Sequence, residues 1–127
     1  MIPPLADRVA LFKAFSRALF KRDVDALYQV VTPDFVWSYH DGIAVVKWLV
    51  GPAAISVHLA EQSTMFSSQV FSEVIYHQLP EMTFMTFRVS ETLRASGEQR
   101  EQRGIEAYTF RDGRVASKDV YRKPILI

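Results

Sequence analysis

The chain has 127 residues, of which 49% are hydrophobic and 23% are charged, and its formal net charge is +1. This composition indicates a globular protein with a buried core, and we expect one domain over residues 1–127. The balanced charge argues against a nucleic-acid-binding protein, which usually carries a basic excess on one face. The sequence contains no cysteine, which excludes disulfides and thiolate chemistry.

Targeting and metal-binding patterns are also missing from the sequence. The N-terminal residues MIPPLADR show no basic region followed by an apolar run, so they are not typical of a signal peptide. No apolar stretch approaches the roughly 20 residues that cross a bilayer. We therefore expect a cytoplasmic protein that does not bind a membrane. His40, His58 and His77 lie far apart without metal-ligand spacing, so we expect neither a metal site nor a cofactor.

The predicted helices lie in the first half of the chain. Apolar residues recur at three- and four-residue spacing over 5–21, which predicts an amphipathic helix. Asp23 has the character of an N-cap and predicts a second helix that stops near Thr32-Pro33. Gly51-Pro52 predicts a break before a third helix over 53–66.

Patterns typical of β-strands occupy the rest of the chain. Residues 35–39 predict a strand, and the apolar run 43–50 predicts a short buried strand or a loop packed on the core. From residue 69 the pattern stays β, with strands over 69–78 and 82–93, and the second is apolar enough to be covered on both faces. Helices followed by a run of antiparallel strands predict an α+β fold.

The last two strands meet at Asp112-Gly113, one of the strongest short-range signals for a hairpin. Gly113 supplies the positive φ that a tight turn needs. In a regular last strand, Asp119 and Lys118 point to opposite faces of the sheet, and one β-bulge would exchange them.

Three segments carry a resemblance to a known family, namely DVDALYQVVTPDFVW (23–37), GPAAI (51–55) and RGIEAYTFRDGRVASKDVYRK (103–123). With the order of elements, they resemble the nuclear transport factor 2-like superfamily over residues 8–123. They are most similar to its SnoaL-like and ketosteroid isomerase-like branch. The resemblance implies three helices packed in a strongly curved, mixed but mostly antiparallel sheet. Such a cystatin-like α+β barrel forms a cone with an internal pocket, and the resemblance also implies a homodimer through the outer face of the sheet.

The resemblance also assigns residues to roles. Ketosteroid isomerases build an oxyanion hole from a tyrosine and a protonated aspartic acid, and use another aspartate as base. By this comparison Phe15 stands at the tyrosine, Tyr39 at the base and Glu106 at the oxyanion-hole acid, so only Glu106 is a like residue. Phe15 has no proton to donate, and a tyrosine of ordinary pKa, about 10, is a poor base at neutral pH. SnoaL-type cyclases use an acid on a late strand, where Asp119 is the nearest match.

Each candidate catalytic residue has two interpretations. Glu106 in an apolar pocket would act as a general acid or base, and the alternative is an ion pair with Arg88 or Lys118. His40 with Asp41 is either a base and its partner or a polar turn. Tyr39 would donate a hydrogen bond to a ligand oxygen, and the alternative is that its ring simply packs against neighbouring side chains. Asp119 belongs to the pocket, or to a dimer face or an ion pair.

Further side chains either line a pocket for a flat hydrophobic ligand or belong to an ordinary core. They are Phe15, Leu19, Trp37, Trp48, His58, Phe87, Tyr108 and Phe110. His58 has the added alternative of a histidine satisfied on its helix face.

These observations predict a protein that binds a small hydrophobic molecule carrying a carbonyl or hydroxyl group. The expected chemistry is cofactor-free acid–base work, such as isomerisation, cyclisation, hydration or dehydration. The alternative is a non-catalytic ligand-binding or dimerisation module of the same fold. Convergence of Glu106, His40 and Tyr39 on one cavity would favour the enzyme. A cavity filled by Phe15 and Trp37, with Glu106 paired to an arginine, would favour the module.

Overall fold

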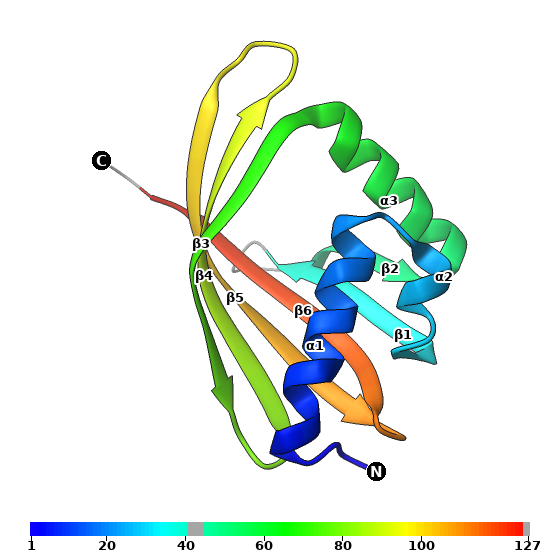
Figure 1. Ribbon diagram of the computed structural model, residues 1–127. Helices are drawn as coiled ribbons and strands as arrows, with labels where there is room; N and C mark the ends of the chain where they lie inside the picture. The colour runs from blue at the N-terminus through cyan, green and yellow to red at the C-terminus, as the bar shows by residue number, and fades with distance from the viewer. Residues whose placement is uncertain (41–44, 126–127) are drawn as a thin grey trace.

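The computed structural model describes residues 1–40 and 45–125, and its elements follow the order that the sequence predicts (Figure 1). The helices are α1 (Leu5–Phe20), α2 (Val24–Leu27) and α3 (Pro52–Met65). The strands are β1 (Val31–His40), β2 (Val45–Val50), β3 (Phe66–Gln78), β4 (Met82–Leu93), β5 (Gln99–Arg111) and β6 (Arg114–Pro124).

The second helix is shorter than predicted. Asp23 caps it as expected, because its carboxylate accepts a hydrogen bond of 3.0 Å from the backbone N–H of Ala26. The helix nevertheless ends at Leu27, and β1 begins at Val31. The β-branched residues before Pro33 favour a strand, and a proline disfavours helical backbone in the residue before it.

The strands form one six-stranded mixed sheet in the order β2-β1-β6-β5-β4-β3. Among the described strands only β1 and β6 pair in parallel, and the other pairs are antiparallel. Asp112 and Gly113 adopt φ angles of 53° and 73°, which form the predicted tight turn between β5 and β6. The predicted α+β class and the mostly antiparallel sheet are therefore confirmed.

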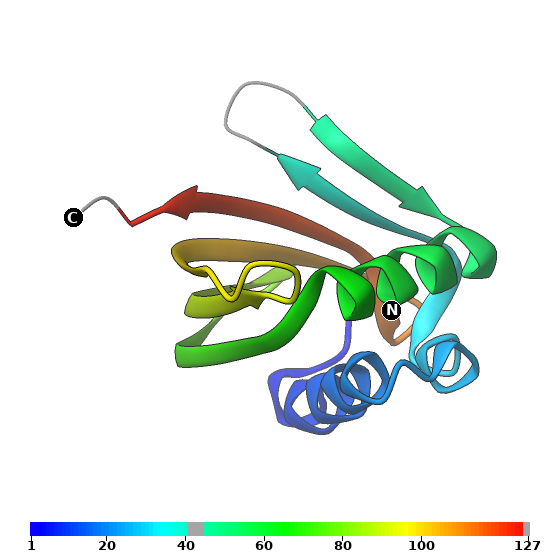
Figure 2. The ribbon, with the colours of Figure 1, turned by 90° about the horizontal axis from the view of Figure 1, so that it is seen from above.

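The sheet has two different faces. All three helices lie on one side of it, which we call the inner face, and the opposite side is the outer face (Figures 1 and 2). The sheet twists without curling strongly around the helices, so the cone and its internal pocket stay a prediction (Figure 1). β4 is buried on its inner face only, and outer residues such as Phe84 are half-buried. The prediction that both faces of this strand are covered is therefore wrong.

The core lies between the helices and the inner face. Its buried apolar side chains include Phe12 and Phe15 of α1 and Ile55 of α3, packed on strand residues such as Trp37 and Val120. No helix among the described residues combines the length and apolar composition that crossing a membrane requires.

Candidate functional site

A buried carboxylate lies on the inner face of β5. Glu106 is 3% exposed, and Tyr108, two residues along the strand, donates its hydroxyl to Glu106 Oε1. Lys118 Nζ lies 3.6 Å from the same oxygen, because Lys118 is the direct cross-strand partner of Tyr108 on β6. Glu106 is thus buried among apolar groups and is also paired with Lys118, one of the two partners proposed for it.

Aromatic rings surround the Lys118 ammonium group. Its nitrogen lies 4.2 Å from the ring centroid of Trp37 and 5.6 Å from that of Phe15. The pKa of Lys118 is lowered, chiefly by burial, and the nearby Glu106 carboxylate offsets only part of this effect. The pKa of Tyr108 is raised by burial and then by Glu106, so its hydroxyl keeps its proton. Trp37 and Phe15 therefore hold a cation beside the carboxylate.

A second polar pair lies beside Trp37. The Tyr39 hydroxyl and His58 Nε2 are 3.2 Å apart. Burial first, and then Lys47 and Lys118, lowers the pKa of His58 to about 4, and burial raises the pKa of Tyr39. Both groups are therefore neutral at neutral pH.

This neutral pair leaves hydrogen-bond donors on the inner face. When Tyr39 donates to His58 Nε2, the imidazole proton sits on Nδ1. Among the described residues, His58 Nδ1 and the indole nitrogen of Trp37 are buried without a hydrogen-bond partner. Their rings are 4.9 Å apart between centroids, so two donors without partners lie on neighbouring side chains.

An inner-face ion pair joins β4 and β6. Arg122 Nη1 lies 3.3 Å from Glu91 Oε2, and Gln69 Nε2 donates to the same oxygen at 2.6 Å. No pattern in the sequence marks Glu91 or Gln69 as part of a site. Strand alternation does indicate the position of Arg122, because it places this residue on the same face of β6 as Lys118.

His40 and Asp119 form a separate cluster on the outer face. His40 Nε2 lies 2.9 Å from Asp119 Oδ1, to which Ser38 also donates at 2.7 Å. Tyr121 donates to Asp119 Oδ2 at 2.8 Å, and its ring stacks on that of His40 with 4.6 Å between centroids. Asp119 is therefore engaged by Ser38, His40 and Tyr121, away from the inner face.

The structure thus does not bring His40 together with Glu106 and Tyr39. Tyr39 and His40 are consecutive residues of a strand, so their side chains point to opposite faces. Lys118 faces inward and Asp119 outward for the same reason.

The predicted ligand-lining residues divide in the same way. Trp48 is 61% exposed and pairs with Ser38 in the register, so it lies on the outer face. The remaining ones belong to the core or pack against it, namely Phe15, Leu19, Trp37, His58, Phe87, Tyr108 and Phe110. Asp41 lies outside the described residues. Across residues 1–40 and 45–125, no three His, Asp or Glu side chains gather closely enough to hold a metal ion.

Comparison with known proteins identifies the family. The SnoaL-like domain family matches residues 12–118. The chain belongs to this family. A search of curated proteins found no match by sequence.

Solved structures share the fold of this SnoaL-like protein. An NTF2-like protein from Burkholderia xenovorans LB400 has a TM-score of 0.80 and 20% identity, covering 93% of this chain and 90% of its own. A hypothetical protein with a ketosteroid isomerase-like fold from Catenulispora acidiphila DSM 44928, in complex with trimethylamine, has a TM-score of 0.70 and 14% identity, covering 87% of this chain and 83% of its own. A proposed polyketide cyclase from Xanthomonas campestris pv. campestris has a TM-score of 0.72 and 15% identity, covering 89% and 87%. At these identities the likeness shows the fold alone.

Proposed function

We propose that this SnoaL-like protein binds a small apolar molecule with a carbonyl or hydroxyl group on the inner face and transfers a proton on it without a cofactor. Isomerisation, cyclisation, hydration and dehydration all fit this chemistry. The observation that carries the proposal is the buried Glu106 carboxylate, held by the Tyr108 hydroxyl and the Lys118 ammonium. The likeness to a proposed polyketide cyclase supports it.

The inner-face groups suit complementary roles. Glu106 would take a proton from carbon or oxygen of the ligand, and Lys118, with Nζ 3.6 Å from Oε1, pairs with the carboxylate before that step. His58 Nδ1–H and the indole N–H of Trp37 would donate to the ligand oxygen as negative charge develops on it. Tyr39 is a positioning residue, since its hydrogen bond to Nε2 leaves the imidazole proton on Nδ1.

The internal pocket is part of this proposal. Trp37, Phe15 and the Lys118 side chain occupy the space next to Glu106. A ligand therefore reaches Glu106 when the flexible Lys118 side chain or an aromatic ring moves aside, which would open the cone between the helices and the sheet.

The same packing favours one alternative, a non-catalytic binding or dimerisation module. Here the Glu106–Lys118 pair only fixes β5 to β6, and the aromatic rings around it are core. Under either function we propose that a second copy packs on the outer face, where apolar side chains such as Ile105 (44% exposed) and Trp48 (61% exposed) are uncovered.

Tryptophan indole signals distinguish binding on the inner face from binding elsewhere. The chain has two tryptophans, the buried Trp37 and the exposed Trp48. In ¹⁵N-labelled protein titrated with 2-tetralone or 2-naphthol, we expect the indole N–H of Trp37 to shift downfield as it gains an acceptor, while Trp48 stays in place. Shifts limited to Trp48, or none at saturation with either probe, would contradict the proposal.

A further inference from the structure

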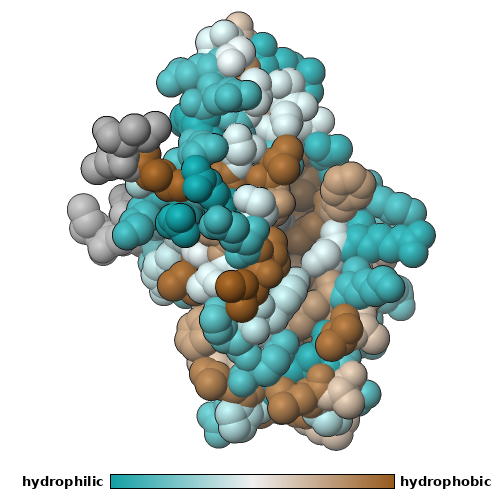
Figure 3. Space-filling view, turned by 60° about the vertical axis from the view of Figure 1, so that its left-hand side comes forward, coloured by the Kyte–Doolittle hydropathy of each residue, from teal (hydrophilic) through white to brown (hydrophobic). Residues whose placement is uncertain are grey.

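Two regions with polar side chains lie outside the Glu106 centre. The first is a groove of about 680 Å³ on the outer face, which the second copy of the proposed dimer would cover (Figure 3). The second lies on the inner face, where Arg122 of β6 reaches across β5 and pairs with Glu91 of β4. Because the Arg122 and Glu91 side chains point to the inner face, they would take no part in that dimer contact.

Arg122 is held in a network that joins β6, β4, β3 and α3. Its Nη1 lies 3.3 Å from Glu91 Oε2, and the Glu91 side chain is only 3% exposed. Gln69 of β3 donates to the same oxygen at 2.6 Å and to Gln62 Oε1 of α3 at 3.1 Å. These contacts fix the Glu91 carboxylate, and the carboxylate in turn fixes the guanidinium.

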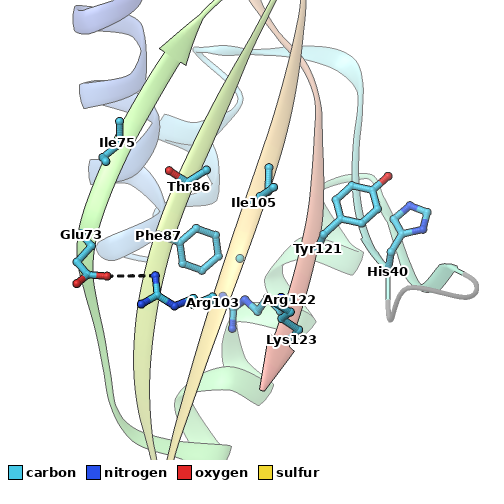
Figure 4. Close-up of a pocket in the computed structure, with 11 residues that line it drawn as sticks. His40, Glu73, Ile75, Thr86, Phe87, Arg103, Ile105, Tyr121, Arg122 and Lys123 are labelled. Atoms are coloured by element: carbon cyan, nitrogen blue, oxygen red, sulfur yellow. Dashed lines mark ion pairs between the residues drawn. The ribbon is translucent and has the colours of Figure 1, made fainter. Parts of the chain in front are cut away.

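One donor of this guanidinium is unused. Among the described residues, Arg122 Nε is buried and has no hydrogen-bond partner. Phe87 and Arg122 are both cross-strand partners of Gly104 (Figure 4), and the guanidinium carbon lies 5.5 Å from the Phe87 ring centroid and 5.7 Å from that of Phe71. A buried donor without an acceptor is costly, so Nε marks a place between apolar rings where an acceptor is missing.

The strand register places this donor at one end of the inner face and Trp37 at the other. On β6, Lys118 pairs with Trp37, and Val120 pairs with Glu106. Arg122 follows two residues after Val120, so about 13 Å of strand separates it from Lys118. The row that holds Glu106 therefore lies between the row of Trp37 and the row of Arg122.

The Arg122 end of the inner face is also the more open one. Phe71 faces inward, because its cross-strand partner Val89 is buried in the core. Its side chain is nevertheless 43% exposed, whereas Trp37 and His58 are 4% and 2% exposed. A ligand that places its ketone at His58 and Trp37 would therefore leave its far end beside Arg122.

We propose that Arg122 forms a second subsite, which binds a neutral oxygen at the far end of the ligand. The subsite rests on the proposed function, because the first oxygen of the ligand is taken to lie at His58 and Trp37. The ligand class is then a flat ketone or phenol with a second acceptor across the molecule, an ether, hydroxyl or carbonyl oxygen. Glu91 decides for a neutral group, since its carboxylate already compensates the guanidinium and would repel an anion.

A matched pair of ligands tests the subsite. 6-Methoxy-2-tetralone carries an ether oxygen far from its ketone, and 6-ethyl-2-tetralone has a methylene group in place of that oxygen. With affinities read from the Trp37 indole signal, we expect the methoxy compound to bind about tenfold more tightly, as a hydrogen bond to a charged donor allows. The 6-carboxylate of 2-tetralone should bind no more tightly than the ethyl compound.

The arginine side chain gives a direct signal in the same ¹⁵N spectra. The Nε–H resonance of Arg122 is identified by its loss in Arg122→Lys. It should move downfield when the methoxy compound binds, because Nε then gains an acceptor, and it should not do so with the ethyl compound.

Two variants separate recognition from a purely structural role. Arg122→Lys keeps a cation beside Glu91 but has no Nε, and Glu91→Gln with Arg122→Met removes both charges. Each should lose most of the preference for the methoxy compound, while Arg17→Lys on the exposed side of α1 should keep it.

The outcomes distinguish this subsite from the proposed function. Equal affinities for the two neutral ketones in the parent, or a preference that survives both variants, would overturn the subsite and leave proton transfer by Glu106 untouched. Tightest binding by the carboxylate would overturn the neutral ligand class. A preference that depends on Arg122, with proton exchange that ignores Glu106→Gln, would support the subsite and refute the proposed function. Ketones that leave the Trp37 signal in place at saturation would contradict both.

Discussion

Lys118 Nζ lies 3.6 Å from Glu106 Oε1, and both side chains are less than one-tenth exposed. Removing one partner of such a pair leaves a buried charge without compensation, which typically costs about 3–5 kcal/mol. Lys118→Met should therefore lower the free energy of unfolding by about this amount in urea denaturation at pH 7. The double variant Lys118→Met with Glu106→Gln should recover most of the loss. A single variant as stable as the parent would show that the pair carries no such energy.

His58 should make stability depend on pH. Its pKa is about 4 in the folded protein and near 6.5 when unfolded, so the unfolded chain binds more protons between these values. The contribution of His58 to the free energy of unfolding is fully present above pH 6.5. As the pH falls towards 4, the free energy of unfolding decreases by on the order of 3 kcal/mol. Urea denaturation at pH 7.5 and 4.5 should show this loss in the parent and a smaller one in His58→Gln. An equal loss in both proteins would contradict the assignment.

Arg8 ties α1 to the turn between β3 and β4. It is 1% exposed and donates to the backbone carbonyls of Pro3 at 3.0 Å, Leu79 at 2.6 Å and Pro80 at 2.7 Å. Arg8→Met leaves these carbonyls without their donor and should lower the free energy of unfolding by about 3 kcal/mol. The exposed Arg17→Met is the matched control and should stay within about 0.5 kcal/mol of the parent. Similar losses in the two variants would refute the role of Arg8.

Gly104 gives the Phe87 ring space against the β5 backbone. A Cβ at this position would lie 2.3 Å from Phe87 Cζ and 2.8 Å from the carbonyl oxygen of Tyr121. Gly104→Ala should therefore destabilise the protein by about 1–3 kcal/mol in thermal unfolding, and adding Phe87→Leu should restore part of the loss. Wild-type stability of the single variant would mean that the contact relaxes without cost.

Local patterns predicted most of the fold. Asp112-Gly113 predicted the last hairpin, and alternation along its second strand predicted that Lys118 and Asp119 point to opposite faces without deciding which of them points inward. Strand alternation also places the side chains of the consecutive residues Tyr39 and His40 on opposite faces of the sheet. The prediction of one site containing both residues followed the family resemblance and disagreed with this alternation.

Other features depend on tertiary contacts that no local pattern contains. The pairing of Tyr39 with His58 joins β1 to α3, and that of Glu91 with Arg122 joins β4 to β6. The start of β1 at Val31 combines the local preference for a strand before Pro33 with such a tertiary contact, because Val31 pairs in parallel with Val115.

The most direct test of the proposed function is hydrogen–deuterium exchange at the carbon next to a ketone. In D₂O, ¹H NMR follows the loss of the acidic protons of 2-tetralone as a base removes them. We expect the parent to accelerate this exchange above buffer, Glu106→Gln to lower the acceleration by about 100-fold or more, and the outer-face variant His40→Gln to match the parent. Exchange that is as fast with Glu106→Gln as with the parent, or that depends on His40 instead, would contradict proton transfer by Glu106 on the inner face.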